Sequence, residues 1–446
     1  MRCTVFGTGY LGATHAVCMA ELGHEVLGVD IDPGKVHKLA SGTVPFYEPG
    51  LEELLRRSLD SGRLSFTTSY AEAVAFADVH FLGVGTPQKR GRHGADLCYV
   101  HRVVDTLAPL IERSSIILGK STVPVGTAAE LGARARALTD IDIEVAWNPE
   151  FLREGFAVQD TLSPDRLVLG VDRDRPGSTR VVEVIRELYS NLITAETPFL
   201  VTDLATAELV KVSANAFLAT KISFINAVSE VCEITGADVT VLAEALGYDT
   251  RIGRRFLNAG LGFGGGCLPK DIRAFIARAD ELGVGHAMAF LRDVDNINMR
   301  RRTKVVEMTA QACGGSLLGA NVAVLGTAFK PESDDVRDSP ALNVAGMIQL
   351  HGAVVTAYDP KALDNSRRAF PTLNYATSIA EACEDADVVL VLTEWQEFTT
   401  LPPANLNDVV RERIVIDGRN CLNATQWRAA GWIYRGMGTP GDAARQ

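Results

Sequence analysis

One cysteine, Cys267, has the clearest potential for chemistry in this sequence. It follows three consecutive glycines in the segment 262–271, and Lys270 and Asp271 come shortly after it. A thiolate acts as a nucleophile where a substrate can approach closely and positive charge lies near. The glycines permit the approach, and Lys270 could supply the charge. The alternative is a small buried thiol, because a free cysteine usually packs as a small apolar side chain.

Three pairs of candidate residues are spaced four positions apart, which places each pair on one face if its segment is helical. One of them is Cys267 with Asp271. Glu150 and Glu154 form an acidic pair, and neighbouring carboxylates tend to split their pKa values, as acid/base pairs do. Lys211 and Asn215 lie among apolar residues and could stabilise an oxyanion or relay a proton. The structural alternatives are a solvated acidic face, and a lysine that extends to solvent beside a packed asparagine.

A glycine-rich turn near the N-terminus predicts where a dinucleotide binds. Gly7, Gly9 and Gly12 match Gly-x-Gly-x-x-Gly, whose glycines permit a tight turn, close approach of the pyrophosphate and close helix packing. The pyrophosphate would lie at the N-terminus of the following helix. Asp30 ends the next predicted strand, where its carboxylate would bind a ribose diol and repel a 2′-phosphate. We therefore expect NAD, with NADP disfavoured but not excluded, because Lys35 could contact the ribose edge.

The elements that must position these residues fall into three regions. Residues 1–200 alternate strands with helices, which predicts a doubly wound parallel sheet and an NAD-binding Rossmann domain. Residues 201–300 are helical and begin with a run of over thirty residues without glycine or proline, far longer than a mean helix. Residues 316–440 repeat the alternation. The sequence therefore predicts an α/β protein with two Rossmann-like domains, joined by a long central helix and a helical, dimerising segment.

The second alternating region repeats the first but lacks its fingerprint. Residues 352–359 parallel residues 23–30, yet the turn after the region's first strand lacks two of the three glycines. A second dinucleotide is therefore not expected there. Lys330, Arg337 and Arg419 could instead hold the phosphates of a different ligand.

Composition limits the classes of function. The 446 residues are too many for one core, and a net charge of −11 argues against a nucleic-acid partner, which requires a basic surface. The eight cysteines lack Cys-x-x-Cys spacing, so we expect neither disulfides nor a metal. No apolar run approaches the roughly 20 residues that span a bilayer, and no apolar signal segment opens the chain. We therefore expect a cytoplasmic protein without a membrane partner.

Taken together, these motifs resemble those of the UDP-glucose/GDP-mannose dehydrogenase family. The resemblance extends from Met1 to about Leu422. Its motifs lie at residues 7–12, 47–51, 121–124, 148–152, 211 with 215, 262–271 and 329–330. The resemblance implies an NAD-dependent, four-electron oxidation of the C6 hydroxyl of a nucleotide sugar to a carboxylate. Residues 47–51 and 251–253 favour UDP-glucose, giving UDP-glucuronate, and the alternatives are a UDP-N-acetylhexosamine or GDP-mannose.

The resemblance also implies roles for individual residues. Cys267 would attack an aldehyde to form a thiohemiacetal, and a second oxidation would leave a thioester for water to hydrolyse. The expected catalytic residues are Cys267, Lys211, Asn215, Asp271, Glu150 and Thr122. The expected cofactor-binding residues are Gly7, Gly9, Tyr10, Leu11, Gly12, Asp30, Lys35, Thr86, Thr122, Glu154, Lys270 and Arg337. The expected substrate-binding residues are Glu150, Phe151, Leu152, Arg153, Lys211, Asn215, Arg251, Phe256, Leu257, Gly264, Phe329, Lys330 and Arg419.

Two other classes of function remain open. A two-electron β-hydroxyacid-type dehydrogenase also pairs a Rossmann domain with a lysine and an asparagine on a long helix, but it needs neither Cys267 nor a second α/β domain. A non-catalytic NAD-sensing or scaffold protein would leave the candidate catalytic side chains dispersed. At Gly266 and Pro269 the sequence differs from that of some members of the family. These differences concern the specificity for the sugar and not the reaction. The long helix predicts a homodimer or a higher homo-oligomer.

Overall fold

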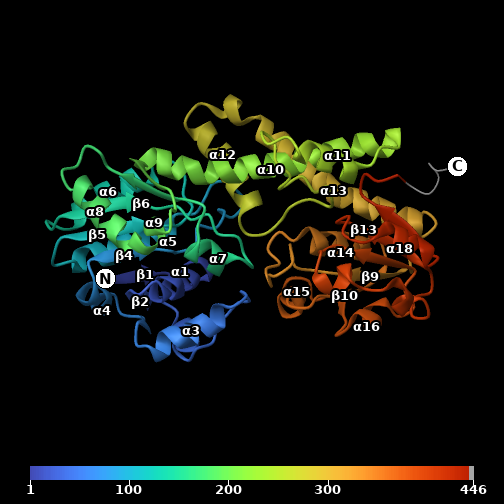
Figure 1. The fold of residues 1–446 in the computed structure, drawn as a ribbon, viewed down its shortest axis with the longest axis horizontal. Coiled ribbons are helices and arrows are strands. Elements are labelled where there is room, and N and C mark those ends of the chain that lie inside the picture. Colours follow the sequence, from blue (N-terminus) through green and yellow to red (C-terminus); the bar gives the residue numbers. More distant parts are fainter. Residues whose placement is uncertain (441–446) are drawn as a thin grey trace. The chain divides into compact units, whose positions relative to one another are not determined.

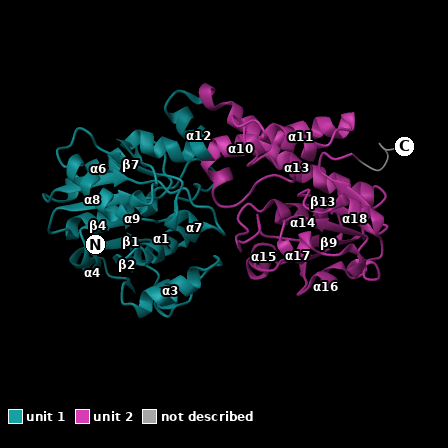
Figure 2. Ribbon diagram, in the orientation of Figure 1, with its two compact units in different colours: residues 1–214, 273–285 teal, residues 215–272, 286–446 magenta. Residues whose placement is uncertain are grey.

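The computed structural model of the protein describes residues 1–440. It contains two compact units, shown in separate colours in Figure 2. Unit 1 comprises residues 1–214 and 273–285, and unit 2 comprises residues 215–272 and the chain from residue 286 onward. Each unit is built on one sheet covered by helices (Figure 1), which confirms the predicted pair of Rossmann-like domains.

The sheet of unit 1 has eight strands in the order β3-β2-β1-β4-β5-β6-β7-β8. All neighbouring pairs are parallel except β6 and β7. The strand order reverses between β1 and β4, and ligands of such sheets bind at the carboxyl ends of the strands at this point. The strands are β1 (Arg2–Phe6), β2 (Glu25–Val29), β3 (Leu64–Thr67), β4 (Val79–Leu82), β5 (Ser115–Gly119), β6 (Ile143–Trp147), β7 (Leu167–Val171) and β8 (Phe199–Asp203).

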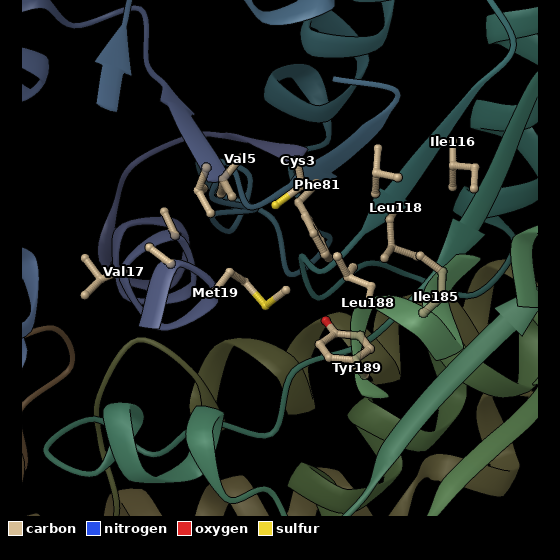
Figure 3. Packing of buried hydrophobic residues seen from close by; sticks show 14 of the residues in the cluster. Cys3, Val5, Val17, Met19, Phe81, Ile116, Leu118, Ile185, Leu188 and Tyr189 are labelled. Carbon is tan, nitrogen blue, oxygen red and sulfur yellow. The ribbon is translucent and has the colours of Figure 1, made fainter. Parts of the chain in front are cut away.

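Helices cover both faces of this sheet, because alternate strand residues bury apolar side chains on opposite sides. On one side Val5 and Phe81 belong to the same core cluster as Met19 and Leu188 (Figure 3). Cys3 lies in this core, and burial raises the pKa of its thiol to about 12. The helices are α1 (Tyr10–Glu21), α2 (Pro33–Ala40), α3 (Leu51–Asp60), α4 (Tyr70–Phe76), α5 (Cys98–Leu107), α6 (Thr127–Leu138), α7 (Ala157–Leu162), α8 (Ser178–Leu188) and α9 (Ser190–Thr194), with a 3-10 turn at Ala108–Leu110.

The predicted long helix is α10 (Leu204–Thr235), which has 32 residues. It begins directly after β8 and carries both Lys211 and Asn215. The division between the units falls within this helix, and again within α12 (Leu268–Glu281). The remaining helices of the central region are α11 (Val239–Gly247), a 3-10 turn at Gly285–Met288 and α13 (Phe290–Ala312).

The sheet of unit 2 has six parallel strands in the order β11-β10-β9-β12-β13-β14. This order matches that of the first six strands of unit 1, which confirms the internal repeat. Its strands are β9 (Asn321–Leu325), β10 (Val354–Tyr358), β11 (Asn374–Tyr375), β12 (Val388–Val391), β13 (Ile414–Asp417) and β14 (Ile433–Gly436). Its helices are α14 (Pro340–Leu350), α15 (Leu363–Ala369), α16 (Ile379–Cys383), α17 (Gln396–Thr399) and α18 (Ala424–Ala429), with a 3-10 turn at Pro403–Leu406.

The repeat includes an aspartate that braces the first turn of each sheet. Asp30 follows β2 and accepts a hydrogen bond from the backbone N–H of Thr8 at 2.8 Å. Asp359 follows β10 and accepts one from the N–H of Thr327 at 2.7 Å. The two turns therefore share one backbone arrangement, although only the first contains the glycine fingerprint.

Candidate active site

The glycine turn of unit 1 has the geometry that a dinucleotide requires. Gly7 has a φ of +87°, and a Cβ there would lie 2.6 Å from the Val84 side chain. A Cβ on Gly12 would lie 1.8 Å from the carbonyl oxygen of Gly7. No atom lies within 4 Å of a Cβ built on Gly9, so this backbone is open to a ligand. The turn leads directly into α1, whose free N–H groups can bind a phosphate.

Asp30 is buried at the end of β2 and is held by the turn itself. Its Oδ2 accepts hydrogen bonds from the Thr8 N–H and from the Thr8 hydroxyl at 3.1 Å, and its Oδ1 accepts one from the Asp32 N–H at 3.0 Å. Lys35 Nζ lies 3.7 Å from Oδ2. A carboxylate accepts about four hydrogen bonds, so capacity remains for a ribose hydroxyl, and these residues fit NAD.

Two more predicted cofactor residues contact each other beside this turn. The Thr86 hydroxyl donates a hydrogen bond to the backbone oxygen of Thr122 at 2.7 Å. The two threonines follow β4 and β5, which are neighbours in the sheet, and β4 is one of the two strands at the reversal in strand order. Tyr10 and Leu11 form the half-buried start of α1. The predicted cofactor residues of this turn and these two strand ends thus gather at one edge of the sheet.

Glu208, which sequence reasoning missed, holds the segment that carries Thr122. Its carboxylate on α10 is buried, and it accepts hydrogen bonds from the N–H groups of Gly126 and Ala128, both at 2.7 Å. These groups lie at the N-terminus of α6. Burial raises the pKa of Glu208 to about 7, against the lowering effect of these bonds and of Arg278. In the sequence, a single acid in a long helix gave no signal of this role.

Replacing Glu208 with glutamine is expected to remove a pH dependence of stability. The pKa of about 7 lies above the ordinary value of 4.5, so the folded protein binds this proton more tightly than the unfolded chain. The resulting stabilisation is present at low pH and is lost as the pH rises through 7. From about pH 4.5 to about pH 7, the free energy of unfolding of the wild type should fall by on the order of 2 kcal/mol relative to Glu208→Gln. Urea denaturation across this range measures the difference, and parallel pH curves for the two proteins would contradict it.

Glu150 and Lys211 form an ion pair within unit 1. Lys211 Nζ lies 3.0 Å from Glu150 Oε1, and Glu150 Oε2 accepts a hydrogen bond from the Leu152 N–H at 2.5 Å. Residues 148–156 are not helical, so the expectation that Glu150 and Glu154 share a helix face is wrong. Gly155, which follows Glu154, has a φ of +78°, and this left-handed backbone does not continue a helix. Glu150 is neutralised by a lysine of α10 instead.

The same loop carries three of the predicted substrate residues. Leu152 is half-buried. Arg153 pairs with Asp160 at 2.6 Å, so its charge is already partly neutralised. Two cations lie close to the Phe151 ring: the Arg166 guanidinium is 3.8 Å from the ring centre and Lys211 Nζ is 5.8 Å from it. Arg166 was missed, because nothing in the sequence connects it to Phe151.

Lys120, a third residue that sequence reasoning missed, contacts the first residue of this loop. Its Nζ donates a hydrogen bond to Asn148 Oδ1 at 2.9 Å, and the Tyr189 hydroxyl donates another to the same oxygen at 2.8 Å. Burial lowers the pKa of Lys120 to about 8, and the charge of Glu150 opposes this shift. Lys120 thus anchors the residue from which the Glu150 loop begins.

In unit 2, Cys267 is exposed and directly precedes α12. The alternative of a buried structural thiol is therefore wrong for Cys267, whereas it holds for Cys3, whose thiol is in the core. The N-terminus of a helix favours a thiolate, because its N–H dipoles stabilise negative charge. The position can therefore present a nucleophile to a bound substrate.

Asp271 lies one turn further along α12 and is buried. Its Oδ2 accepts a hydrogen bond from Asn215 Nδ2 at 2.7 Å, and its Oδ1 is 2.6 Å from Lys270 Nζ. Asp271 thus contacts two other predicted site residues of unit 2. The aspartate fixes the Asn215 amide, so its orientation is set before a substrate binds.

The glycines before Cys267 are needed for close packing within unit 2. A Cβ on Gly265, whose φ is +85°, would lie 2.8 Å from the Phe329 ring. A Cβ on Gly266 would lie 2.3 Å from the Arg337 guanidinium. Gly264 is equally crowded, by the backbone of Asp338 at 2.3 Å. Phe329 and Arg337 were predicted site residues, and they lie against the cysteine loop.

Arg419 holds this loop in place through its backbone. It donates hydrogen bonds to the carbonyl oxygens of Gly262 and Leu392, both at 2.9 Å, and of Phe329 at 3.1 Å. Asn298 on α13, which was missed, adds two more bonds, to the N–H and the carbonyl of Phe263. Most N–H donors of the Arg419 guanidinium therefore bond to backbone carbonyls of the protein. These bonds fix the position of the guanidinium before it contacts a phosphate.

The remaining predicted substrate residues of unit 2 lie in different surroundings. Leu257 is buried in a small apolar cluster, and Phe256 has a φ of +65°, a conformation that is rare for an aromatic residue. Lys330 Nζ lies 5.4 Å from the Phe329 ring centre. The side chain of Arg251 is 87% exposed and pairs with Asp249.

Among residues 1–440, no group of three or more histidine, cysteine, aspartate and glutamate side chains could hold a metal ion. Across the same residues, the structure has no helix that is long and apolar enough to cross a membrane.

Comparison with known proteins places this chain among nucleotide-sugar dehydrogenases. Models of the three domains of the UDP-glucose/GDP-mannose dehydrogenase family match it: the NAD-binding domain over residues 1–193, the central domain over 205–300 and the UDP-binding domain over 323–424. A UDP-glucose 6-dehydrogenase of Rhizobium meliloti is 40% identical over 99% of this chain and 100% of its own length. One from Bacillus subtilis is 39% identical over 98% of each.

Solved structures give the same result. A UDP-glucose dehydrogenase from Pyrobaculum islandicum is 39% identical and superposes with a TM-score of 0.90 over 98% of each chain. A UDP-D-ManNAc dehydrogenase from Pyrococcus horikoshii is 27% identical, with a TM-score of 0.85 over 98% of this chain and 99% of the other.

Proposed function

Because this chain belongs to the UDP-glucose/GDP-mannose dehydrogenase family, we propose that it oxidises the C6 hydroxyl of UDP-glucose to a carboxylate with two NAD⁺. The observation that carries the four-electron reaction is Cys267, an exposed thiol at the N-terminus of α12. A single oxidation of an alcohol to an aldehyde needs no nucleophile. A second oxidation does, because an aldehyde must first become a tetrahedral adduct with a C–H bond that can be lost as hydride.

NAD⁺, when bound, accepts one hydride in each oxidation. In the proposed sequence the C6 hydroxyl loses a proton and C6 loses a hydride, which gives the aldehyde. The Cys267 thiolate then forms a C–S bond to C6, and the carbonyl oxygen takes up a proton to give the thiohemiacetal. Loss of that proton and of a second hydride gives the thioester. Water then displaces Cys267, which leaves the carboxylate and the free thiol.

The other candidate catalytic residues stabilise charge, activate water or position groups in these steps. Lys211 stabilises negative charge on the reacting oxygen, and its ion pair with Glu150 keeps the carboxylate available as the base that activates water. Asn215, held by Asp271, donates a hydrogen bond to the same developing oxyanion. Thr122 positions the water. Glu154 orients neighbouring groups rather than reacting.

The test is the amount of NADH released per molecule of UDP-glucose consumed. We expect two, and a value of one would favour the two-electron β-hydroxyacid-type reaction instead. The same assay with a UDP-N-acetylhexosamine and with GDP-mannose tests the sugar and the nucleotide. A non-catalytic NAD sensor would release no NADH with any of them. That alternative expects that Lys211, Asn215, Glu150 and Asp271 do not converge on the Cys267 thiol.

We also propose that the protein is a homodimer, or a higher homo-oligomer, formed through α10. Its half in unit 2 exposes four large apolar residues, Phe217, Phe224, Val231 and Ile234, which are 66%, 54%, 59% and 88% exposed. The first three are spaced by seven residues and so form one stripe. A row of large apolar side chains on a helix favours a protein partner, and a second copy supplies the same stripe. None of the eight cysteines, all of which lie within residues 1–440, forms a disulfide, which fits a reducing compartment, and we place the enzyme in the cytoplasm.

If the protein is a dimer through this stripe, charged residues introduced into the stripe should change its oligomeric state. Phe224→Asp combined with Val231→Asp should convert the protein to a monomer, because two buried carboxylates would face their copies across the interface. Light scattering after gel filtration measures the mass. An unchanged mass would exclude this face of α10 as the interface, and Val241→Asp on the exposed side of α11 is the matched control.

A further inference from the structure

Glu48 is a buried carboxylate whose hydrogen bonds join two segments far apart in the sequence of unit 1. Its side chain belongs to the segment 47–51, and Glu48 is only 6% exposed. Its Oε2 accepts a hydrogen bond from the Gly155 N–H at 2.6 Å, and its Oε1 accepts one from the Ala157 N–H at 2.7 Å. The Tyr10 hydroxyl also donates to Oε2. The carboxylate thus receives three donors from two distant places.

The two places are the ones where the proposed reaction binds its two ligands. Tyr10 lies between the second and third glycines of the dinucleotide turn and is the first residue of α1. Gly155 lies near the end of the loop that contains Glu150 and the predicted substrate residues, and Ala157 is the first residue of α7. The Gly155 N–H also contacts the Tyr10 hydroxyl at 3.2 Å, so tyrosine, glutamate and loop form one network.

Helix capping alone does not account for this arrangement. An N-cap needs only the N–H groups of α7, which a nearby serine or aspartate would satisfy. Glu48 instead comes from the segment between α2 and α3, and it binds a side chain of the cofactor turn as well. Burial and the neighbouring Glu48 raise the pKa of Tyr10 far above its ordinary value, so the phenol remains a donor to the carboxylate throughout the neutral range.

We propose that Glu48 is a positioning residue that fixes the substrate loop relative to the NAD turn through Tyr10. The inference rests on the proposed function, because that function assigns NAD⁺ to the glycine turn and UDP-glucose to the loop that contains Glu150. Displacement of either segment would then disturb the site on the other. Tyr10, which belongs to the cofactor turn, would thus affect the binding of UDP-glucose. Glu48, which lies outside the cofactor turn, would affect the binding of NAD⁺.

The test compares Glu48→Gln, Tyr10→Phe and the double variant in the full-length protein. Titration with NAD⁺ alone gives Kd, and initial rates with UDP-glucose give KM and kcat. Each single variant should weaken both NAD⁺ and UDP-glucose by about tenfold, the usual worth of a hydrogen bond to a charged group. The double variant should be no worse than Glu48→Gln, because both changes break one network. Glu52→Gln, which loses only an exposed pair with Arg56 on α3, should leave both constants unchanged.

Each outcome separates the inference from the function it rests on. If the variants melt earlier but keep the wild-type Kd and KM, Glu48 is only structural and the inference is wrong. Additive effects of the two substitutions would also overturn it. Tyr10→Phe keeps the ring that packs on Phe46, so it remains informative if Glu48→Gln does not fold. If the wild type releases no NADH, the proposed function fails. The NAD⁺ Kd of Glu48→Gln, compared with that of the wild type, still tests whether Glu48 acts on the cofactor turn through Tyr10.

Discussion

Cys267→Ser is expected to abolish net release of NADH from UDP-glucose, with kcat reduced by at least about 1000-fold, while NAD⁺ binds as in the wild type. A serine hydroxyl at the same position is far less nucleophilic, because it is not ionised near neutral pH. The aldehyde is then not captured and the second oxidation does not occur. A spectrophotometric assay of NADH and a separate NAD⁺ titration measure the two effects.

The contrast with a second exposed cysteine makes this result specific. Cys98 is also exposed, at the start of α5, and Cys98→Ser should retain wild-type turnover. Full activity of Cys267→Ser would remove this thiol from the mechanism. Loss of NAD⁺ binding in Cys267→Ser would instead mean that the substitution disturbs the fold.

Lys211→Ala is expected to lower kcat by roughly 100- to 1000-fold, the usual effect of removing one group that stabilises an oxyanion. The lysine is buried, and its ammonium lies 3.0 Å from Glu150. Its loss removes the cation from the reacting oxygen and leaves the carboxylate without its partner. Steady-state rates with saturating NAD⁺ and UDP-glucose measure the change.

A double-mutant cycle with Glu150→Gln identifies the ion pair as the working unit. If the two groups act together, the double variant should be about as slow as Lys211→Ala alone. Lys38→Ala, which removes an exposed lysine of α2, is the matched control and should keep the wild-type rate. A Lys211→Ala enzyme with normal kcat would reduce the ion pair to a contact between α10 and its neighbouring loop.

The fold could be predicted almost completely, because it depends on local patterns. Alternating strands and helices, the glycine turn and a run of over thirty residues without helix breakers each determine a structure within one segment. The repeated aspartates at positions 30 and 359 also indicated that the two sheets are related. Each of these signals lies close together in the sequence, so no knowledge of distant contacts was needed.

Site residues could be predicted only where a reactive or polar residue has neighbours in the sequence that are unusual for its type. Cys267 after its glycines and the lysine–asparagine pair on α10 are such cases. Glu48, Lys120 and Glu208 are not, because each is an ordinary residue whose partner lies 28 or more positions away. The expectation that Glu150 and Glu154 share a helix face was wrong for a related reason: the four-residue spacing assumes a helix, whereas this segment is a loop and Glu150 pairs with a lysine on another element.

The aspartate that braces both turns has a consequence for changing the coenzyme of this enzyme. In the first sheet Asp30 binds the N–H and the hydroxyl of Thr8, and in the second sheet Asp359 binds the equivalent N–H of Thr327 although no fingerprint remains there. The carboxylate is therefore part of the backbone architecture and not only a sensor of the ribose. Exchange of Asp30 for a neutral residue, the usual first step towards NADP, would leave the Thr8 N–H without its acceptor. An engineered variant that accepts the 2′-phosphate would retain this carboxylate and place its new cations on α2 instead.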